Sequence, residues 1–320
     1  MFAASATAFH PDDPLAGLRV GEHPEPAVPE GWAVVEVRAA ALNHHDLWTL
    51  RGVGITADRL PMILGTDAAG VDEDGREVIV HAVVAEGGYP DETLDPTRTL
   101  LSEKHQGTLA QRVVVPRRNL VAKPAGLSWA QAACLPTAWL TAYRMLFTRS
   151  GLQPGQTVLV QGAGGGVSTA AIMLARQAGF RVWVTSRDEG KRSRAVAVGA
   201  HAAFPSGARL PERVDVVLET VGAATWSHSL KSLKPGGRIV VAGATSGSQP
   251  PADLARVYFL QLSVVGSTMG TRTELKQLIR MLDATGLRPL IEREIPLAEV
   301  ADGLRELESG DQFGKLVITP

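Results

Sequence analysis

The hydrophobic pattern in the middle third of the chain alternates between short apolar runs and longer amphipathic segments. Runs rich in Val, Ile and Leu predict strands at 157–160, 181–185, 214–218, 238–242 and 263–266. Segments without proline at 167–178 and 188–198 predict helices, and a glycine follows each of them. Regular alternation of strands and helices is typical of a parallel sheet covered by helices. The predicted fold class is therefore α/β, with a doubly wound Rossmann sheet in the middle of the chain.

The first 120 residues show a different pattern. Short β-type runs at 32–37, 77–80 and 111–115 are separated by Pro, Gly and Asp, which predicts a small β-barrel-like domain. The polar segment 85–106 predicts a surface loop, and the tail predicts a helix at 297–309 followed by a strand at 315–318. A chain of 320 residues exceeds what one core usually fills, so we expect two domains. The C-terminal strand is expected to rejoin the first domain.

Composition and charge point to a globular protein that acts on small molecules. Hydrophobic residues make up 45%, charged residues 20%, and the formal net charge is −1. Lys and Arg are scattered, so no basic patch suited to nucleic acid or to an anionic membrane is predicted. The first residues lack a basic segment followed by an apolar core, and no run of 18 apolar residues occurs. We expect a soluble, cytoplasmic protein.

Cys134 is the only cysteine, which excludes an intramolecular disulfide and a thiolate-rich structural zinc site. It lies in the apolar stretch 132–135, where a buried, inert thiol is the commoner case. A reactive nucleophile is the alternative.

A glycine-rich segment follows the first strand of the Rossmann pattern and precedes its first helix. Residues without a Cβ let the backbone approach a pyrophosphate at the positive end of that helix. This context predicts dinucleotide binding by Gly162, Gly164, Gly165, Gly166 and Val167.

The end of the second strand selects between the two nicotinamide cofactors. Sites for NAD usually place Asp or Glu there, where it accepts a hydrogen bond from the ribose 2′-hydroxyl and repels a 2′-phosphate. This chain has Ser186 and Arg187 instead, and Lys191 and Arg192 follow one turn later. The sequence therefore favours NADPH, with NADH as the alternative because Asp188 and Glu189 lie nearby.

Three further segments, together with the glycine-rich segment, resemble a known family over nearly the whole chain. They read AALNHHDL at 40–47, PMILGTDAAG at 61–70 and LPTAWLTA at 135–142. The chain resembles the medium-chain dehydrogenase/reductase superfamily, within it the quinone oxidoreductase-like branch often labelled zinc-type alcohol dehydrogenase-like. The resemblance implies a GroES-like β-barrel-type catalytic domain (1–122 and 269–320) around a Rossmann NADP-binding domain (123–268), with the active site in the cleft between them. It also implies a homodimer formed through edge pairing of strand 263–266.

The chain departs from the zinc-dependent members of that superfamily. Where they carry Cys, His and Cys as ligands of the catalytic zinc, this chain has Asn43, Thr66 and Thr137. His44, His45 and Asp67 remain as potential ligands, but adjacent histidines are poorly arranged to converge on one ion. We therefore expect no metal, and a zinc alcohol dehydrogenase with unusual ligands is the alternative. Ser168 also replaces the last glycine of the family's glycine-rich loop.

Without a Lewis acid nothing holds an alcohol oxygen as an alkoxide, whereas hydride addition to a quinone or an α,β-unsaturated carbonyl demands less. We therefore expect an NADPH-dependent reductase of such acceptors. The resemblance implies that Asn43 lies near the nicotinamide, and His45 is a candidate proton donor because histidine titrates near neutrality; a turn residue and a structural histidine are the alternatives. A noncatalytic NADPH-binding sensor or structural protein is the other class of function that fits.

The resemblance also implies contacts at the carboxyl ends of the sheet strands and near the C-terminus. The cofactor residues expected there are Thr141, Val221, Gly243, Ala244, Thr245, Ser267, Met269 and a phosphate-reaching Lys315. Trp48, Arg51, Asp67 and Trp139 are candidates for the substrate pocket, and His105, in the loop 85–106, is a further candidate to reach the cleft.

Overall fold

A computed structural model describes residues 1–320, which divide into two compact units. The β-rich unit contains Met1–Leu140 and Gly270–Pro320, and the Rossmann unit contains Thr141–Met269. The first boundary therefore lies at Leu140 and not at residue 122. The reason is that α2 (Trp129–Ala133) packs against β3 and β5 of the β-rich unit. The second boundary falls after Met269, one residue beyond the expected one.

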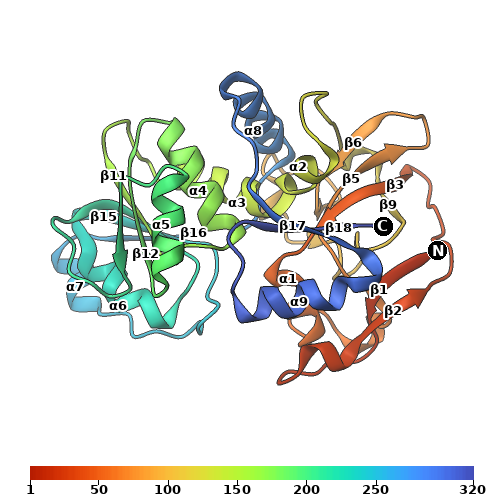
Figure 1. Ribbon diagram of the computed structural model, residues 1–320, viewed down its shortest axis with the longest axis horizontal. Helices are drawn as coiled ribbons and strands as arrows, with labels where there is room; N and C mark the ends of the chain where they lie inside the picture. The colour runs from red at the N-terminus through yellow and green to blue at the C-terminus, as the bar shows by residue number, and fades with distance from the viewer. The chain divides into compact units, whose positions relative to one another are not determined.

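The Rossmann unit is built on six parallel strands in the order β13-β12-β11-β14-β15-β16. In this order the strands are Ala202–Pro205, Arg181–Ser186, Thr157–Val160, Val214–Glu219, Leu233–Val241 and Ser263–Gly266. The connecting helices are α4 (Gly166–Gln177), α5 (Glu189–Ala197), α6 (Ala223–Ser232) and α7 (Leu254–Phe259), and α3 (Leu140–Tyr143) leads into the unit. Figure 1 shows these elements in colours from yellow-green at α3 through green and cyan to light blue at β16. This strand order is that of a dinucleotide-binding sheet, so the predicted doubly wound fold is confirmed.

The main sheet of the β-rich unit joins the two ends of the chain. Its order is β10-β6-β5-β3-β18-β17, and β9 also pairs with β3. These strands are Leu120–Ala122, Glu77–Val80, Asp67–Asp72, Trp32–Ala41, Lys315–Thr319, Ile291–Pro296 and, for β9, Arg112–Pro116. The C-terminal strand β18 pairs antiparallel with β3, with Val317 opposite Ala41. The tail therefore rejoins the first part of the chain, as expected.

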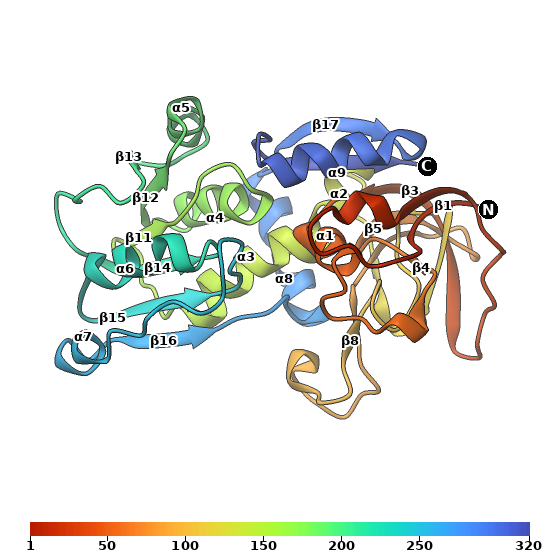
Figure 2. The ribbon, with the colours of Figure 1, turned by 90° about the horizontal axis from the view of Figure 1, so that it is seen from below.

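The remaining elements of the β-rich unit surround this sheet. A second sheet consists of β2 (Leu18–Glu22), β1 (Phe2–Ala6) and β4 (Met62–Ile63), and β7 (Val83–Val84) pairs with β8 (Thr99–Leu100). The helices are α1 (His44–Leu50), α8 (Arg272–Thr285) and α9 (Val300–Ser309). Figures 1 and 2 show α9, in blue, beside β17 and β18, which it contacts. Buried aliphatic side chains from both chain segments, such as Val35, Leu42, Leu304 and Ile318, form one core.

The segment 85–106 is more than a surface loop. Leu101 and Ser102 are completely buried, and the segment contains β8 and a short 3-10 helix at Glu92–Leu94. These buried residues were not predicted, because they are few and widely spaced in a segment of polar composition.

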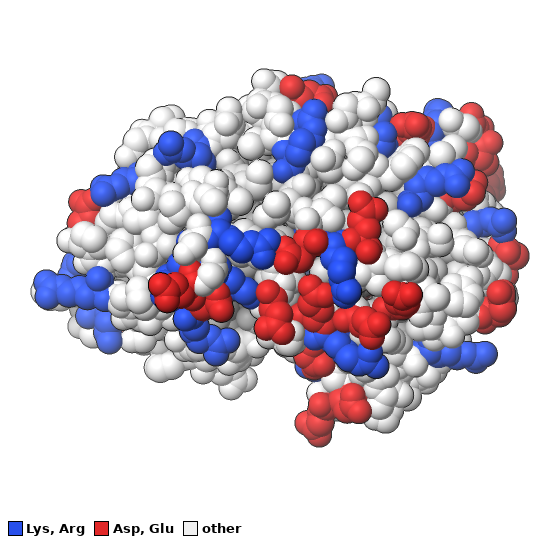
Figure 3. All heavy atoms as spheres, in the orientation of Figure 1, with Lys and Arg blue, Asp and Glu red and all other residues white.

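None of the helices combines the length and the apolar character needed to span a bilayer. The face drawn in Figure 3 carries basic and acidic side chains interspersed with one another, and no large area of a single sign.

Candidate functional site

Three strand ends of the β-rich unit and the helical segment Leu135–Trp139 bring together a group of polar side chains. We call this group the polar cluster: Asn43, Thr66, Asp67, Thr137 and Lys315. Asn43 follows the end of β3, and Asp67 opens β5 opposite Ala41. Continuing the β18–β3 register by two residues from Val317 and Ala41 places Lys315 opposite Asn43. The Leu42 amide, which donates to the Leu316 carbonyl at 2.9 Å, continues the same pairing. Sheet geometry thus joins residues that are 272 positions apart in sequence.

Lys315 is the charged centre of the polar cluster. Its side chain is 3% exposed. Its Nζ donates to the Leu42 carbonyl at 2.6 Å, to Asn43 Oδ1 at 2.7 Å and to Asp67 Oδ2 at 3.3 Å. An ammonium has three N–H donors, so these three oxygens use all of them. In this arrangement Lys315 is not available to a phosphate, in contrast to the role that the resemblance implied.

The lysine determines how the Asn43 carboxamide is oriented. An ammonium only donates hydrogen bonds, so Asn43 must present its oxygen to Lys315 and its NH₂ group to the other side. There Nδ2 donates to Asp67 Oδ2 at 2.8 Å, and it lies 3.2 Å from the Ala41 carbonyl and 3.3 Å from Thr66 Oγ1. Thr66 Oγ1 in turn lies 2.9 Å from Thr137 Oγ1. Thr66 is fully buried, whereas Thr137 is half-buried and is the exposed end of this chain of hydrogen bonds.

Asp67 has one oxygen in the cluster and one without a partner. Oδ2 accepts from Asn43 and Lys315, but Oδ1 is buried and has no hydrogen-bond partner. Because a buried carboxylate oxygen without a partner is costly, the ammonium beside it is needed to hold Asp67 in this position.

Asp46 holds the backbone at Asn43 and at Gly65, which precedes Thr66 of the polar cluster. It lies at the third position of α1, and its completely buried carboxylate accepts from the Asn43 amide at 2.8 Å and from the Gly65 amide at 2.9 Å. Burial raises the pKa of Asp46 to about 6. Gly65 has a φ of +101°, and a Cβ there would lie 2.7 Å from the Leu109 amide nitrogen, so only glycine fits.

The positions that correspond to zinc ligands do converge, but their chemistry does not suit zinc. Asn43 Nδ2 lies 3.3 Å from Thr66 Oγ1, which lies 2.9 Å from Thr137 Oγ1. These side chains offer amide and hydroxyl groups in place of thiolate and imidazole. The structure contains no group of three His, Cys, Asp or Glu side chains arranged to hold a metal ion. The residues present therefore do not fit a catalytic zinc ion.

The two adjacent histidines do not join the polar cluster through hydrogen bonds. His45 Nε2 lies 3.2 Å from Glu103 Oε1, and its Nδ1 is buried without a partner. Burial, followed by the charges of Lys315 and Arg51, lowers the pKa of His44. His45 is thus engaged with the segment 99–105, and its predicted role in proton delivery stays a prediction.

The predicted substrate-pocket residues have different surroundings. Trp139 is 1% exposed, so its indole packs in the core and cannot line a pocket in this structure. Arg51 donates to Glu308 Oε1 at 2.6 Å and stacks over the ring of Trp48. Asp67 is fully buried in the polar cluster. Of the four, only Trp48 and Arg51 are partly exposed.

In the Rossmann unit the glycine-rich segment forms an open cradle before α4. Gly162 and Gly164 have φ angles of +79° and +116°, which favour glycine. A Cβ on Gly162 would lie 2.9 Å from Val221 Cγ2, at the end of β14. Ser168 turns its hydroxyl back to the Gly165 carbonyl at 2.9 Å, so it does not fill the cradle. Because the first amides of α4 lack helical partners, this segment fits a dinucleotide pyrophosphate.

The last position of β12 carries no carboxylate. Ser186 is its last residue, and Arg187 is exposed. Asp188, the nearest acid, caps α5 by accepting from the Lys191 amide at 2.6 Å. Arg192 donates to the carbonyls of Ser186 and Arg187 and so braces this turn. These residues fit a 2′-phosphate better than a 2′-hydroxyl.

The other predicted cofactor residues lie at the carboxyl ends of the strands or on α3. Val221 follows β14, the segment Gly243–Thr245 follows β15, Ser267 and Met269 follow β16, and Thr141 is buried in α3. The buried Ser267 hydroxyl has no partner, as expected of a group that would contact a ligand. Met269 adopts a φ of +49°, which is uncommon for a residue with a side chain.

Glu219, the buried last residue of β14, was not predicted from the sequence as a site residue. Its carboxylate accepts from the amides of Val221 and Gly222 at 2.8 and 3.0 Å and from Ser229 Oγ at 2.6 Å. It thereby fixes the loop that faces Gly162. An acid directly after the apolar run Val216–Leu218 was the available signal.

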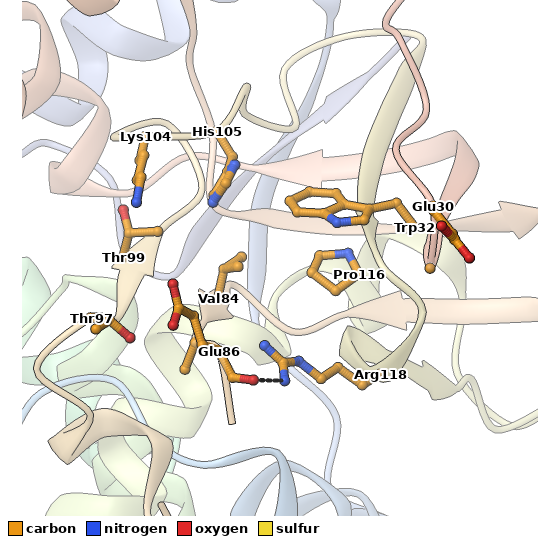
Figure 4. Close-up of a pocket in the computed structure, with 12 residues that line it drawn as sticks. Glu30, Trp32, Val84, Glu86, Thr97, Thr99, Lys104, His105, Pro116 and Arg118 are labelled. Atoms are coloured by element: carbon orange, nitrogen blue, oxygen red, sulfur yellow. Dashed lines mark hydrogen bonds between the residues drawn. The ribbon is translucent and has the colours of Figure 1, made fainter. Parts of the chain in front are cut away.

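A separate pocket of about 440 Å³ lies within the β-rich unit. Figure 4 shows Trp32, Val84 and Pro116 among its apolar lining residues, with Lys104 and His105 nearby and Arg118 donating to the Glu86 carbonyl. His105 packs against the ring of Trp32, with centroids 4.9 Å apart. No residue of the polar cluster lines this pocket, so we do not assign the reaction to it.

Cys134 is inert, as expected. It is buried, its thiol donates to the Ala130 carbonyl, and burial raises its pKa to about 12.

Residues 29–125 match the family described as the alcohol dehydrogenase GroES-like domain, and residues 166–284 match the zinc-binding dehydrogenase family. Acryloyl-coenzyme A reductase of Metallosphaera sedula is 30% identical over 95% of this chain and 96% of its own length. The chain belongs to the medium-chain dehydrogenase/reductase superfamily.

Two solved structures of this superfamily show how far the similarity extends. An NAD-dependent alcohol dehydrogenase is 34% identical, with a TM-score of 0.91 over 100% of both chains. A cobalt- and zinc-bound thermostable alcohol dehydrogenase from Pyrobaculum aerophilum is 31% identical, with a TM-score of 0.90 over 100% of this chain and 99% of the other. The predicted combination of a GroES-like domain and a Rossmann domain is confirmed.

Proposed function

We propose that this protein is an NADPH-dependent reductase of α,β-unsaturated carbonyl compounds that works without a zinc ion. An α,β-unsaturated acyl thioester is the preferred acceptor. The observation that carries the proposal is the polar cluster, in which Asn43, Thr66 and Thr137, the positions that the resemblance gives as zinc ligands, are joined by hydrogen bonds. The similarity to an acryloyl-coenzyme A reductase over nearly the full chain supports the choice of acceptor.

The Rossmann unit would hold the cofactor. Gly162 to Gly166 and the start of α4 would bind the pyrophosphate, and Ser186 and Arg187 would bind the 2′-phosphate. When bound, NADPH supplies a hydride. The Ser267 hydroxyl, which has no partner within the protein, is available to the carboxamide.

The polar cluster would meet the acceptor's carbonyl group. Addition of a hydride to the β-carbon moves negative charge onto the carbonyl oxygen, and a hydrogen-bond donor placed there lowers the barrier. Thr66 Oγ1 accepts from Asn43 Nδ2, so Thr66 can direct its own hydrogen to Thr137. The hydrogen of the half-buried Thr137 hydroxyl is then free to point at the carbonyl oxygen. A proton from water to the α-carbon completes the reduction.

An alcohol is a poorer substrate for this arrangement. Its oxidation needs the oxygen held as an alkoxide, which zinc provides in zinc-dependent enzymes. A hydroxyl donor such as Thr137 provides far less stabilisation, whereas it suffices for a neutral acceptor whose oxygen gains delocalised enolate charge as the hydride is added.

The test is NADPH oxidation by purified, chelator-treated protein with crotonyl and acryloyl thioesters, α,β-unsaturated ketones and quinones, with NADH beside it. We expect turnover of the thioesters, a preference for NADPH and no loss after chelation. Turnover of quinones alone would change the acceptor class. Cofactor binding without turnover would favour a sensor or structural protein, and activity that requires added zinc would favour a zinc alcohol dehydrogenase.

A further inference from the structure

A buried network of hydrogen bonds adjoins the glycine-rich segment of the Rossmann unit. At its centre is Gln161, a fully buried residue that directly follows β11. Its Oε1 accepts from Thr185 Oγ1 at 2.5 Å. Its Nε2 lies 3.0 Å from Ser229 Oγ and 2.9 Å from His228 Nδ1. The Gln161 carboxamide therefore joins β12 to α6 at the end of β11.

The Glu219 carboxylate determines which groups of this network donate. A carboxylate only accepts, so the Ser229 hydroxyl donates to Glu219 Oε2 at 2.6 Å and accepts from Gln161 Nε2. The second hydrogen of Nε2 goes to His228 Nδ1. The ring of His228 carries its own hydrogen on Nε2, which donates to the Ala208 carbonyl at 2.8 Å.

Thr185 connects the network to the glycine-rich segment. Because both hydrogens of its NH₂ group are used, Gln161 presents its oxygen to Thr185, whose hydroxyl must donate. The lone pairs of Thr185 Oγ1 then remain for the Gly162 amide, which lies 3.5 Å away. The Thr185 carbonyl accepts from the Ala163 amide at 2.9 Å. Thr185 thus holds the start of the glycine-rich segment, and Ser186, at the predicted 2′-phosphate position, follows it directly.

The other end of the network holds the loop after β14. Glu219 Oε1 accepts from the amides of Val221 and Gly222, at 2.8 and 3.0 Å. This loop closely approaches the glycine-rich segment, since a Cβ on Gly162 would lie 2.9 Å from Val221 Cγ2. One set of hydrogen bonds therefore spans both sides of the predicted pyrophosphate site.

We propose that Gln161 is a positioning residue for the cofactor, because its carboxamide holds the glycine-rich segment and the loop after β14 in the arrangement that binds the NADPH pyrophosphate. The inference rests on the proposed use of NADPH. Oε1 and both hydrogens of Nε2 have partners, and a buried network that is fully satisfied is rigid. A binding site that is already in its bound arrangement loses less entropy when the ligand binds.

Removing the carboxamide would leave its partners unsatisfied. Without Gln161 Oε1 the Thr185 hydroxyl loses its acceptor, and without Nε2 the Ser229 hydroxyl loses its donor. Both hydroxyls belong to fully buried residues, where a lost partner is costly. The two hydroxyls would turn to other partners, and the start of the glycine-rich segment would move with Thr185.

The experiment measures NADPH binding to Q161M by isothermal titration calorimetry, with no acceptor present. Methionine has nearly the length of glutamine but only a weak acceptor and no donor. We expect the Kd for NADPH to rise by about tenfold or more. A purely structural role would lower the thermal midpoint of the ligand-free protein and leave the Kd unchanged. A Kd within about twofold of wild type would overturn the proposal.

Gln312 provides a matched control. It is 3% exposed, belongs to the β-rich unit, and its Oε1 has no hydrogen-bond partner. Q312M also replaces a buried carboxamide, but it should leave the Kd for NADPH within about twofold of wild type. A rise equal to that in Q161M would show that loss of any buried carboxamide, and not the place of Gln161, is responsible.

A pair of variants at Thr185 tests the network with Gln161 in place. T185V removes the hydroxyl that donates to Gln161, whereas T185S keeps it. We expect T185V to raise the Kd for NADPH by about tenfold and T185S to change it by less than about threefold. T157V, at the opposite end of β11, is the control and should bind NADPH like wild type. Equal Kd values for T185V and T185S would contradict the proposal.

These binding measurements separate the inference from the proposed reaction. They need no acceptor, so a protein that binds NADPH but turns over no unsaturated carbonyl compound would overturn the reductase and still support the role of Gln161. Wild-type turnover together with unchanged NADPH binding in Q161M and T185V would overturn the role of Gln161 alone.

Discussion

Glu103 Oε1 lies 3.2 Å from His45 Nε2 and ties the segment 99–105 to the start of α1. Glu103 also accepts from the Leu100 amide and from Thr99 Oγ1, and the pairing with His45 contributes to lowering the pKa of its carboxyl. The histidine thus has a structural partner, and its other ring nitrogen is buried.

From this pairing we expect His45→Gln to affect stability more than the chemical step. The variant should keep kcat within about threefold of wild type and should not move the limbs of the pH–rate profile, because water supplies the proton in the proposed reaction. Steady-state kinetics between pH 5 and 9 check this. Loss of one limb of the profile would identify His45 as the proton donor.

Thr137→Val tests the proposed donor to the carbonyl oxygen. Valine keeps the shape and removes the hydroxyl, so kcat with an unsaturated thioester should fall by about 100-fold. Thr7→Val is a matched control, because the Thr7 hydroxyl donates to the Gly17 carbonyl and not to any residue of the polar cluster. An unchanged kcat in Thr137→Val would remove this residue from the mechanism.

Ser186→Asp tests the choice of cofactor. A carboxylate at the end of β12 would repel a 2′-phosphate and accept from a 2′-hydroxyl, so kcat/KM should fall for NADPH and rise for NADH. We expect the ratio of kcat/KM for NADPH to kcat/KM for NADH to change by about 100-fold or more. Ser193→Asp, on the exposed side of α5, adds the same charge and should leave the ratio nearly unchanged. A ratio that does not move would contradict the assignment of the 2′-phosphate site.

Asp46 should make stability depend on pH. Its pKa rises from 3.8 to about 6 on folding, so the native state favours the protonated form. The stability linked to it is fully present below about pH 4 and is lost as the pH rises through about 6, by up to about 3 kcal/mol. Urea unfolding of wild type and Asp46→Asn at pH 4, 5, 6 and 7 should show wild type losing stability relative to the variant. A constant difference across this range would contradict the prediction.

The parts of the site that depend on local pattern could be predicted from the sequence. The glycine-rich turn and the end of β12 lie next in sequence to the strands that position them. The spacing of apolar residues, together with the turn residues that flank them, identifies those strands. Lys315 could not be placed in this way. Its partners are Asn43 and Asp67, and only the pairing of β18 with β3 and of β3 with β5 brings the three together. Trp139 was misplaced for a related reason, because the buried face of a short helical segment depends on the sheet that covers it.

We propose that the exposed edge of the Rossmann sheet forms the interface of the predicted homodimer. β16 pairs with β15 on one side only, so its other side presents unpaired backbone groups. Val264 on this strand is 50% exposed, and Phe259 of the neighbouring α7 is 82% exposed. Pairing of two β16 strands would cover both. We therefore expect V264K combined with F259D to shift the mass measured by light scattering from dimer to monomer, whereas V196K, at an exposed valine of α5, should not. A wild-type protein that is monomeric at micromolar concentration would contradict the predicted assembly.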